Sequence, residues 1–179
     1  KTSEVEITIK YEFDKYFQID GGVGYASGTN FPYFERSGDD FFIAASNAKS
    51  FSANLNFLFH QGPYGTFYAS GEFNETRDSA NFTLPYHPSI KAEASYAYNF
   101  AGKYLTELKL KFASEVFTNI ANTNKLPSYV DLGFKFGYKV SKDFEWILEV
   151  SNILNRNNYI WQGYIEQPVN VTAGFNYNW

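Results

Sequence analysis

The chain contains no cysteine and no methionine, and it has only two histidines among 179 residues. Without cysteine it has neither a disulfide framework nor a thiolate metal site. It also lacks a run of about 20 apolar residues, which excludes a membrane-spanning helix. The net charge of −4 argues against a nucleic-acid partner. At this length we expect a single domain covering residues 1–179.

Aromatic residues are abundant instead, with 19 Phe and 15 Tyr, more than a soluble core needs. Apolar and aromatic residues recur at every second position in segments of about 9–11 residues, the length of a tilted strand that crosses a bilayer. The segments are 3–13, 16–26, 50–60, 64–76, 89–100, 103–114, 128–138, 142–153 and 167–179. This pattern predicts an all-β, antiparallel, up-and-down transmembrane β-barrel, with about nine strands visible.

Charged residues fall almost only between the apolar positions, as Glu6 does between Val5 and Ile7. A Lys or Arg that faces lipid at mid-depth costs roughly 2–4 kcal/mol, so a barrel requires this segregation. A soluble sheet with one wet face would show it too. Segment 64–76 is ambiguous, because an outward Phe67 turns its neighbour Tyr68 inward.

Connections between the segments alternate in length, which separates the two alternatives. The short ones lie at 14–15, 61–63, 101–102 and 141–142, and the long ones at 27–49, 77–88, 115–127 and 154–166. Outer-membrane barrels have short periplasmic turns and long external loops. Aromatic residues crowd the short turns: Phe13, Tyr16, Phe17, Phe59, Tyr98, Phe100, Tyr104, Tyr138, Phe144, Tyr177 and Trp179. We interpret them as an interfacial girdle, which disfavours a soluble sheet.

The C-terminal strand carries a further signal, because it alternates strictly and ends on an aromatic residue. Its polar, glycine and aromatic positions are Thr172, Gly174, Tyr177 and Trp179. This pattern resembles the terminal signal that the barrel-assembly machinery of Gram-negative bacteria reads. We therefore expect a multi-pass protein of the cell outer membrane, in contact with outer-membrane lipid.

The strand count is informative, because single-chain bacterial barrels normally have an even number of strands. If the last strand ends in the periplasm, the first of nine begins outside. The odd count indicates either a miscounted strand or an upstream part of a longer protein.

Residues 126–179 resemble the C-terminal end of TonB-dependent outer-membrane receptors, particularly those of Bacteroidetes-type bacteria. The matching stretches are 126–133 (Leu-Pro-Ser-Tyr-Val-Asp-Leu-Gly), 140–143, 149–155 (Glu-Val-Ser-Asn-Ile-Leu-Asn), a Tyr-rich hairpin at 159–164, 167–170 and 173–175. The resemblance implies a larger barrel of about 22 strands that encloses an N-terminal plug and couples to TonB, and this chain contains no plug. It also implies energised uptake of a scarce nutrient such as an iron chelate, a cobalamin or a glycan. The alternative is a complete small barrel of about 8 or 10 strands with an adhesive or structural role.

Several residues of the long loops are candidates for ligand contact, because planar chelates and sugars stack on aromatic rings. They are Phe31, Tyr33, Tyr86, His87, Trp161 and Tyr164. A scaffold role is the alternative for Trp161 and Tyr164, and Phe41 and Phe42 read as an upper girdle. The mixed inward charges predict cross-strand pairing or contact with a plug or lumen water.

No catalytic constellation is evident, since His87 is the one histidine near Ser79, Ser89 and Asp78, and it reads as a solvated loop residue. We therefore expect neither an enzyme nor a resident cofactor or metal.

Overall fold

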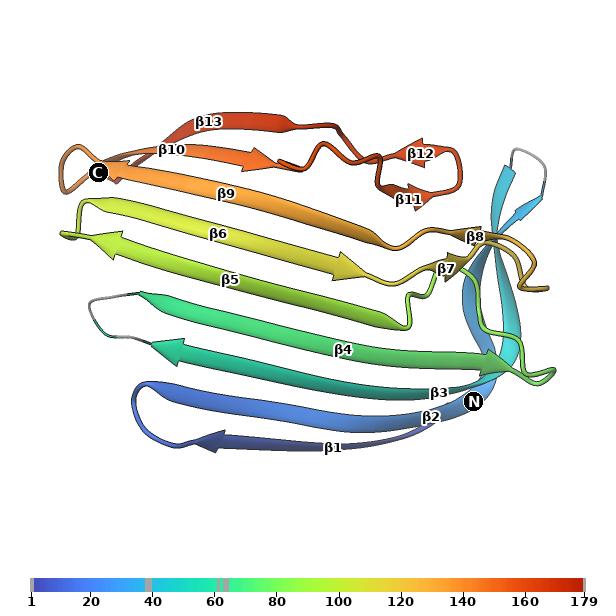
Figure 1. The fold of residues 1–179 in the computed structure, drawn as a ribbon. Coiled ribbons are helices and arrows are strands. Elements are labelled where there is room, and N and C mark those ends of the chain that lie inside the picture. Colours follow the sequence, from blue (N-terminus) through green and yellow to red (C-terminus); the bar gives the residue numbers. More distant parts are fainter. Residues whose placement is uncertain (1, 38–39, 61, 63–64, 179) are drawn as a thin grey trace.

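The main element is a nine-stranded antiparallel sheet in the order β1-β2-β3-β4-β5-β6-β9-β10-β13 (Figure 1). It is seen in a computed structural model that describes residues 2–37, 40–60, 62 and 65–178. The strands are β1 (Thr2–Glu12), β2 (Phe17–Ser37), β3 (Asp40–His60), β4 (Thr66–Asp78), β5 (Ile90–Phe100), β6 (Tyr104–Ala113), β9 (Tyr129–Lys139), β10 (Phe144–Ser151) and β13 (Asn170–Tyr177).

Two of the long connections contain a short hairpin. Between β6 and β9, β7 (Val116–Phe117) pairs with β8 (Lys125–Leu126), and between β10 and β13, β11 (Tyr159–Trp161) pairs with β12 (Tyr164–Ile165). The expected Tyr-rich hairpin is therefore present. Within the described part of the chain, no helix has the length and apolarity needed to span a membrane.

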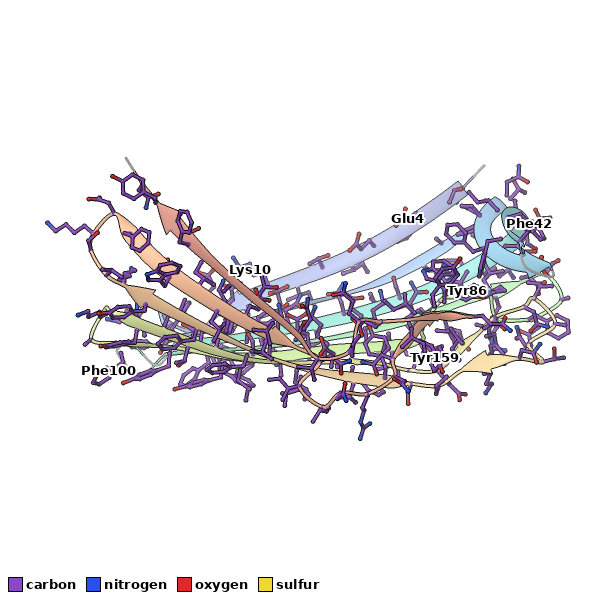
Figure 2. The ribbon with its side chains drawn as sticks, turned by 90° about the horizontal axis from the view of Figure 1, so that it is seen from above. Glu4, Lys10, Phe42, Tyr86, Phe100 and Tyr159 are labelled. Atoms are coloured by element: carbon purple, nitrogen blue, oxygen red, sulfur yellow. The ribbon has the colours of Figure 1, made fainter. Side chains whose placement is uncertain are left out.

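Figure 1 shows that the short β1–β2, β5–β6 and β9–β10 turns lie at one end of the sheet and the long connections at the other, while most of the predicted turn at 61–63 lies outside the described residues. β13 ends at the short-turn end, and β1 begins at the long-connection end. Both placements confirm the predicted strand directions. The sheet curves into an open trough (Figure 2), in which β1 and β13 are the edge strands of the described residues.

Cross-strand register aligns the apolar positions of every strand on one face. One row runs Tyr11, Ile19, Phe57, Ala69, Ala94, Leu110 and Leu132 from β1 to β9. Figure 2 places Phe100 on the convex side, and Glu4 and Lys10 on the concave side. The ambiguity in β4 is resolved, because Phe67 aligns with outward Phe59 while Tyr68 turns inward and donates to Asn56 Oδ1 at 3.4 Å.

The convex face takes the place of a conventional core. Among the described residues only Tyr33, Ala48, Leu84, Ala113 and Leu126 are buried hydrophobics. The accessible surface is 11811 Å², against about 8,900 Å² expected for a compact protein of this mass. The convex face is apolar and uncovered, with side chains such as Ile9 69% and Phe175 63% exposed. A surface of this kind is stable in hydrocarbon and would aggregate in water.

The aromatic residues near the short turns form edge-to-face chains along the convex rim. One chain runs from Tyr11 through Phe13, Phe17 and Phe57 to Phe67, with ring centroids 4.4–5.8 Å apart. Further along the rim Tyr104 stacks on Tyr138 at 5.1 Å, and Phe144 contacts Phe175 at 5.7 Å. The predicted lower girdle is therefore present, except that Trp179 lies outside the described residues.

The prediction of a long loop over residues 27–49 was wrong. β2 continues to Ser37 and β3 begins at Asp40, so most of this range is a paired hairpin that rises beyond β1 and β4. A β-bulge between Gly28 and Phe31, where Asn30 has a φ of 63°, reverses which residues of β2 face inward. Gly28, Asn30 and Pro32 are typical of loops, and this composition concealed the strand.

A buried asparagine fixes the corner that follows β10. Asn152 is 2% exposed, and its side-chain amide donates to the carbonyls of Arg156 (2.9 Å) and Gln167 (3.0 Å). Its Oδ1 accepts from the backbone N–H of Arg156, and the backbone N–H of Asn152 donates to Asp131 Oδ1 at 2.8 Å. The residue also adopts a φ of 49°, a conformation that asparagine tolerates. Asn152 therefore ties both ends of the 154–166 connection to β9.

Placing a charge on the convex face tests its contact with lipid. Leu108→Arg, near mid-depth on β6, should cost roughly 2–4 kcal/mol of membrane stability. Leu105→Arg puts the same charge on the concave face of the same strand and should cost far less. The measurement is the amount of folded, heat-modifiable protein in outer membranes, and equal losses for both variants would contradict the assignment of the faces.

Removing the Asn152 side chain tests the corner. Asn152→Ala should destabilise the 154–166 connection by roughly 2–4 kcal/mol, because it leaves buried backbone groups unsatisfied. Asn155→Ala is the matched control, since Asn155 has a similar φ of 48°, while among the described residues its side chain makes one long hydrogen bond, accepted from Val169 N at 3.4 Å. The rate at which added protease cuts this connection reports local opening. Similar rates for the two variants would show that backbone conformation, not the buried hydrogen bonds, holds the corner.

Candidate ligand-contact site at the long-connection end

Five aromatic rings from three connections meet at the long-connection end of the trough. We call Phe34, Phe41, Tyr86, Trp161 and Tyr164 the mouth cluster. Trp161 is its centre, with ring centroids 4.6 Å from Tyr86, 5.0 Å from Phe34 and 5.8 Å from Phe41. Phe41 also contacts Tyr86 at 6.1 Å and Tyr164 at 6.2 Å. The cluster thus joins the β2–β3 hairpin to a connection more than 100 residues later in the sequence.

Trp161 and Tyr164 are positioned by the β11–β12 hairpin, whose base is anchored at Asn158. Asn158 is 3% exposed, and its side-chain amide donates to Glu166 Oε2 at 3.2 Å. The amide of Glu166 donates in return to the Asn158 carbonyl at 2.7 Å. Together with the Asn152 corner, these bonds hold the hairpin in one orientation.

Tyr86 is held by the β4–β5 connection, which packs against the β6–β9 connection. Leu84 is 1% exposed, and Asn122 holds the residue before it through two 2.8 Å bonds to the backbone of Thr83. The amide of Tyr86 donates to the Phe117 carbonyl at 2.8 Å. Tyr86 has a φ of 58°, which is uncommon for a bulky residue, so the surrounding contacts determine where its ring points.

Phe31 and Tyr33 do not join the mouth cluster. After the bulge they face inward, where buried Tyr33 packs with Ala48 and Leu84 and has Phe31 beside it. Burial, and then the Glu35 carboxylate, raise the pKa of the Tyr33 phenol, which stays a neutral donor to Glu35. We therefore assign Phe31 and Tyr33 to the packing of the extended hairpin, and ligand contact by them stays a prediction.

His87 is adjacent to the cluster but turned to its own backbone. Its Nδ1 lies 2.7 Å from the Pro85 carbonyl oxygen, and the side chain is part-buried. This bond is a local structural role, and ligand contact by His87 stays a prediction. Phe41 belongs to the mouth cluster and not to the upper girdle that its sequence position suggested.

A pocket of about 160 Å³ lies beside the cluster, lined by Tyr86 and Trp161 together with Tyr129, Tyr159 and Lys91. Ligand sites for whole small molecules usually exceed about 300 Å³. This pocket is therefore suited to one ring or one sugar of a larger ligand, stacked on aromatic faces. Tyr129 and Tyr159 were not identified from the sequence, because they sit at strand ends and their proximity depends on the fold.

The concave face carries the predicted mixture of charges. Lys109 pairs with Glu93 at 2.9 Å and Lys91 with Glu72 at 3.7 Å, both between neighbouring strands. Glu107, Lys135 and Glu149 stand opposite one another in one row. Cross-strand pairing thus accounts for part of these charges. In the ranges that the structure describes, no group of three His, Cys, Asp or Glu side chains is placed to hold a metal ion.

The proposed assembly signal lies on β13. Tyr177 pairs with Phe144 on the convex face, while Thr172 and Gly174 align with Glu149 and Ile147 on the concave face. Trp179 is outside the described residues. Recognition by the assembly machinery stays a prediction.

Comparison with known proteins finds similarity in structure alone. No protein-family model matches the chain. No curated protein sequence matches it either. The copper transporter OprC has a TM-score of 0.83 at 12% identity over 98% of this chain and 31% of its own. The pyoverdine outer membrane receptor FpvA from Pseudomonas aeruginosa PAO1 has a TM-score of 0.75 at 13% sequence identity, and the match covers 99% of this chain and 30% of FpvA. The ferric yersiniabactin uptake receptor FyuA from Yersinia pestis has a TM-score of 0.73 at 14% sequence identity, and the match covers 98% of this chain and 28% of FyuA.

These proteins are named as transporters and receptors, not enzymes. The chain spans less than a third of the length of each. At such low identity the similarity establishes the fold, and it does so over nearly the whole chain. The chain therefore has the fold of part of the barrel wall of TonB-dependent outer-membrane receptors, as its sequence resemblance predicted.

Proposed function

We propose that this chain is the C-terminal part of the barrel of an outer-membrane receptor that takes up a scarce nutrient. The observation that carries the proposal is the nine-stranded trough itself. Its uncovered apolar convex face and charged concave face fit a wall between lipid and an aqueous lumen. Its similarity to OprC, with a TM-score of 0.83, supports the same reading.

The open edges of the trough favour a wide barrel. β1 and β13 are separated by the full width of the sheet (Figure 2), and backbone groups at free edges cannot be left unpaired in lipid. Further strands would satisfy both edges, and the resemblance implies about 22 in total. The same resemblance implies that the whole protein carries a plug in the lumen and couples to TonB. A complete small barrel of about 8 or 10 strands would need β1 and β13 to meet, so this alternative is less favoured.

The mouth cluster and its pocket are the features best suited to nutrient recognition. They lie at the end that carries the long connections, which we assign to the cell exterior. A cluster of aromatic rings with few charges fits a planar chelate or a sugar, which can stack on an exposed ring face. Residues elsewhere in the whole protein would complete the site, because the pocket holds only a part of such a ligand.

Uptake experiments test this function directly. Cells with and without the native protein are given three labelled probes: ferric catecholate, cobalamin and a short glycan. We expect the protein to raise accumulation of one probe, and a protonophore to abolish the gain, because energised uptake needs the inner-membrane potential. Accumulation that is unchanged for all three, or insensitive to the protonophore, would contradict a TonB-dependent receptor for this class of nutrient.

Replacing the central ring of the mouth cluster tests the site. Trp161→Ala should lower accumulation of the active probe about tenfold at limiting concentration, the equivalent of about 1.4 kcal/mol from lost aromatic contacts. Trp146→Ala, which removes a lipid-facing tryptophan, is the control and should leave accumulation per folded receptor unchanged. Equal accumulation by both variants would assign the cluster to scaffold packing alone.

A further inference from the structure

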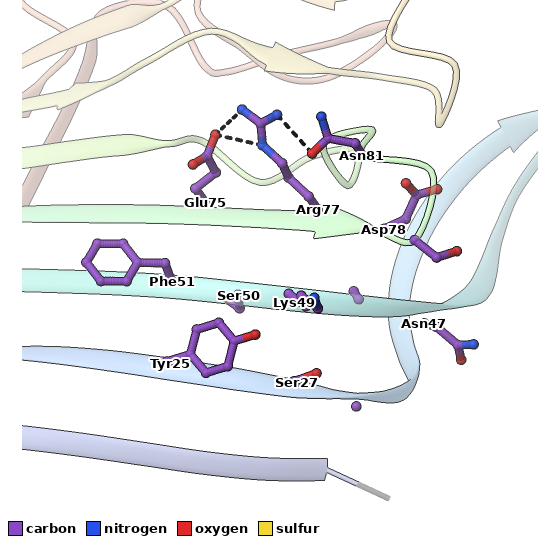
Figure 3. Close-up of a pocket in the computed structure, with 13 residues that line it drawn as sticks. Tyr25, Ser27, Asn47, Lys49, Ser50, Phe51, Glu75, Arg77, Asp78 and Asn81 are labelled. Atoms are coloured by element: carbon purple, nitrogen blue, oxygen red, sulfur yellow. Dashed lines mark hydrogen bonds and ion pairs between the residues drawn. The ribbon is translucent and has the colours of Figure 1, made fainter.

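A separate cavity lies on the convex face and not at the mouth. It has a volume of about 420 Å³ and lies across β2, β3 and β4 at the long-connection end (Figure 3). Its lower edge is formed by Tyr25 and Phe51, which are 47% and 45% exposed at the upper limit of the apolar band. Below them the outward positions Val23, Ala53 and Leu55 are apolar. The cavity therefore sits where the outward face changes from hydrocarbon-facing to polar.

Register shows that the polar side chains of this cavity point away from the lumen. Phe51, Lys49 and Asn47 occupy alternate positions on β3, and Lys49 stands opposite Ser27 on β2 and Arg77 on β4. The intervening residue Ser50 belongs to the concave side, where it bonds Thr76 at 2.8 Å. The site is thus separated by the thickness of the sheet from the proposed nutrient path.

Arg77 is fixed in place along one wall of the cavity. Its guanidinium forms an ion pair with Glu75, including a 2.9 Å bond from Nε to Oε1, and Nη1 donates to Asn81 Oδ1 at 3.2 Å (Figure 3). Asn81 lies in a tight turn in which Asp78 Oδ1 accepts from the amides of Ala80 (2.9 Å) and Phe82 (2.8 Å). Both carboxylates of the cavity are therefore already engaged by internal donors.

Lys49 is the second cation of the site. Within the described residues its ammonium has no ion pair, although it stands next to Arg77. Ser27, Asn47 and Asn81 add neutral hydrogen-bonding groups around it. A cation above an aromatic and apolar surface, ringed by amides and a hydroxyl, complements a phosphate on a sugar that carries acyl chains.

We propose that this cavity binds the phosphorylated sugar headgroup of a glycolipid of the outer leaflet. Lys49 and the free N–H groups of Arg77 hold the phosphate. Asn47, Asn81 and Ser27 bond the sugar hydroxyls, and the acyl chains descend over Tyr25 and Phe51. The inference rests on the proposed placement in an outer membrane, but not on uptake of any nutrient.

The test uses the native protein purified in detergent and titrated with diphosphorylated lipid A, with bound lipid counted by native mass spectrometry. Lys49→Gln should weaken binding roughly fivefold, since one basic residue near a charged lipid surface is worth about 1 kcal/mol. Lys91→Gln, on the concave face, should leave binding unchanged. Equal affinity of the two variants would overturn the proposal.

A second pair of variants distinguishes binding from a merely structural role. Glu75→Gln releases Arg77 from its ion pair, so affinity for lipid A should rise several-fold even though a contact is lost. Glu72→Gln, three residues earlier on β4 and facing the lumen, should have no effect. A fall in affinity for Glu75→Gln would show that the ion pair shapes the site only as structure, and would contradict phosphate binding by Arg77.

Two further binding experiments distinguish a lipid headgroup from free phosphate as the source of the phosphate. Dephosphorylated lipid A should bind clearly more weakly, and inorganic phosphate should compete poorly because it lacks the acyl chains. Equal binding of the dephosphorylated lipid, or full competition by inorganic phosphate, would overturn a headgroup site.

If fractionation finds the wild-type protein outside the outer membrane, the proposed function fails as well. If uptake persists while Lys49→Gln binds lipid normally, only this inference fails.

Discussion

The structure depends on one constraint: in hydrocarbon every backbone N–H and C=O group must find its partner within the protein. For a chain without a long apolar run, antiparallel strands in continuous register satisfy it. That register then decides where every side chain points, because alternate residues face opposite sides. The apolar row from Tyr11 to Leu132 and the charged rows of the concave face are two consequences of the same pairing.

Beyond the apolar band the constraint is relaxed, and the chain uses other devices. β2 and β3 continue as a paired hairpin beyond β1 and β4, Asn152 and Asn158 organise the last connection, and Asn122 joins two neighbouring loops. These devices bring the rings of the mouth cluster together from distant parts of the sequence. The same end of the molecule therefore offers two separate surfaces, an aromatic one at the end of the trough and one lined by Lys49 and Arg77 on its convex face.

Much of the barrel wall was predictable because period-two alternation records the faces directly. This alternation predicted the number and directions of the strands. It also predicted the convex residues, such as Leu108, and the lower girdle. Residues 27–49 were misread because Gly28, Asn30 and Pro32 suit turns as well as bulged strands. The mouth cluster was foreseen only as separate residues, since the contact of Phe34 and Phe41 with Trp161 depends on how three connections fold. The convex cavity was not predicted, because Lys49 lies in the range 27–49 that was interpreted as a loop and so had no assigned face.

The central claim is that this trough is one section of a larger barrel, and the size of the native chain tests it most directly. An antibody against the connection at residues 161–168 would detect the protein in isolated outer membranes. The account predicts a band several times larger than the 20.5 kDa of this chain, in keeping with its coverage of 31% of OprC. A single band at 20.5 kDa would contradict it and would show that these strands close on themselves.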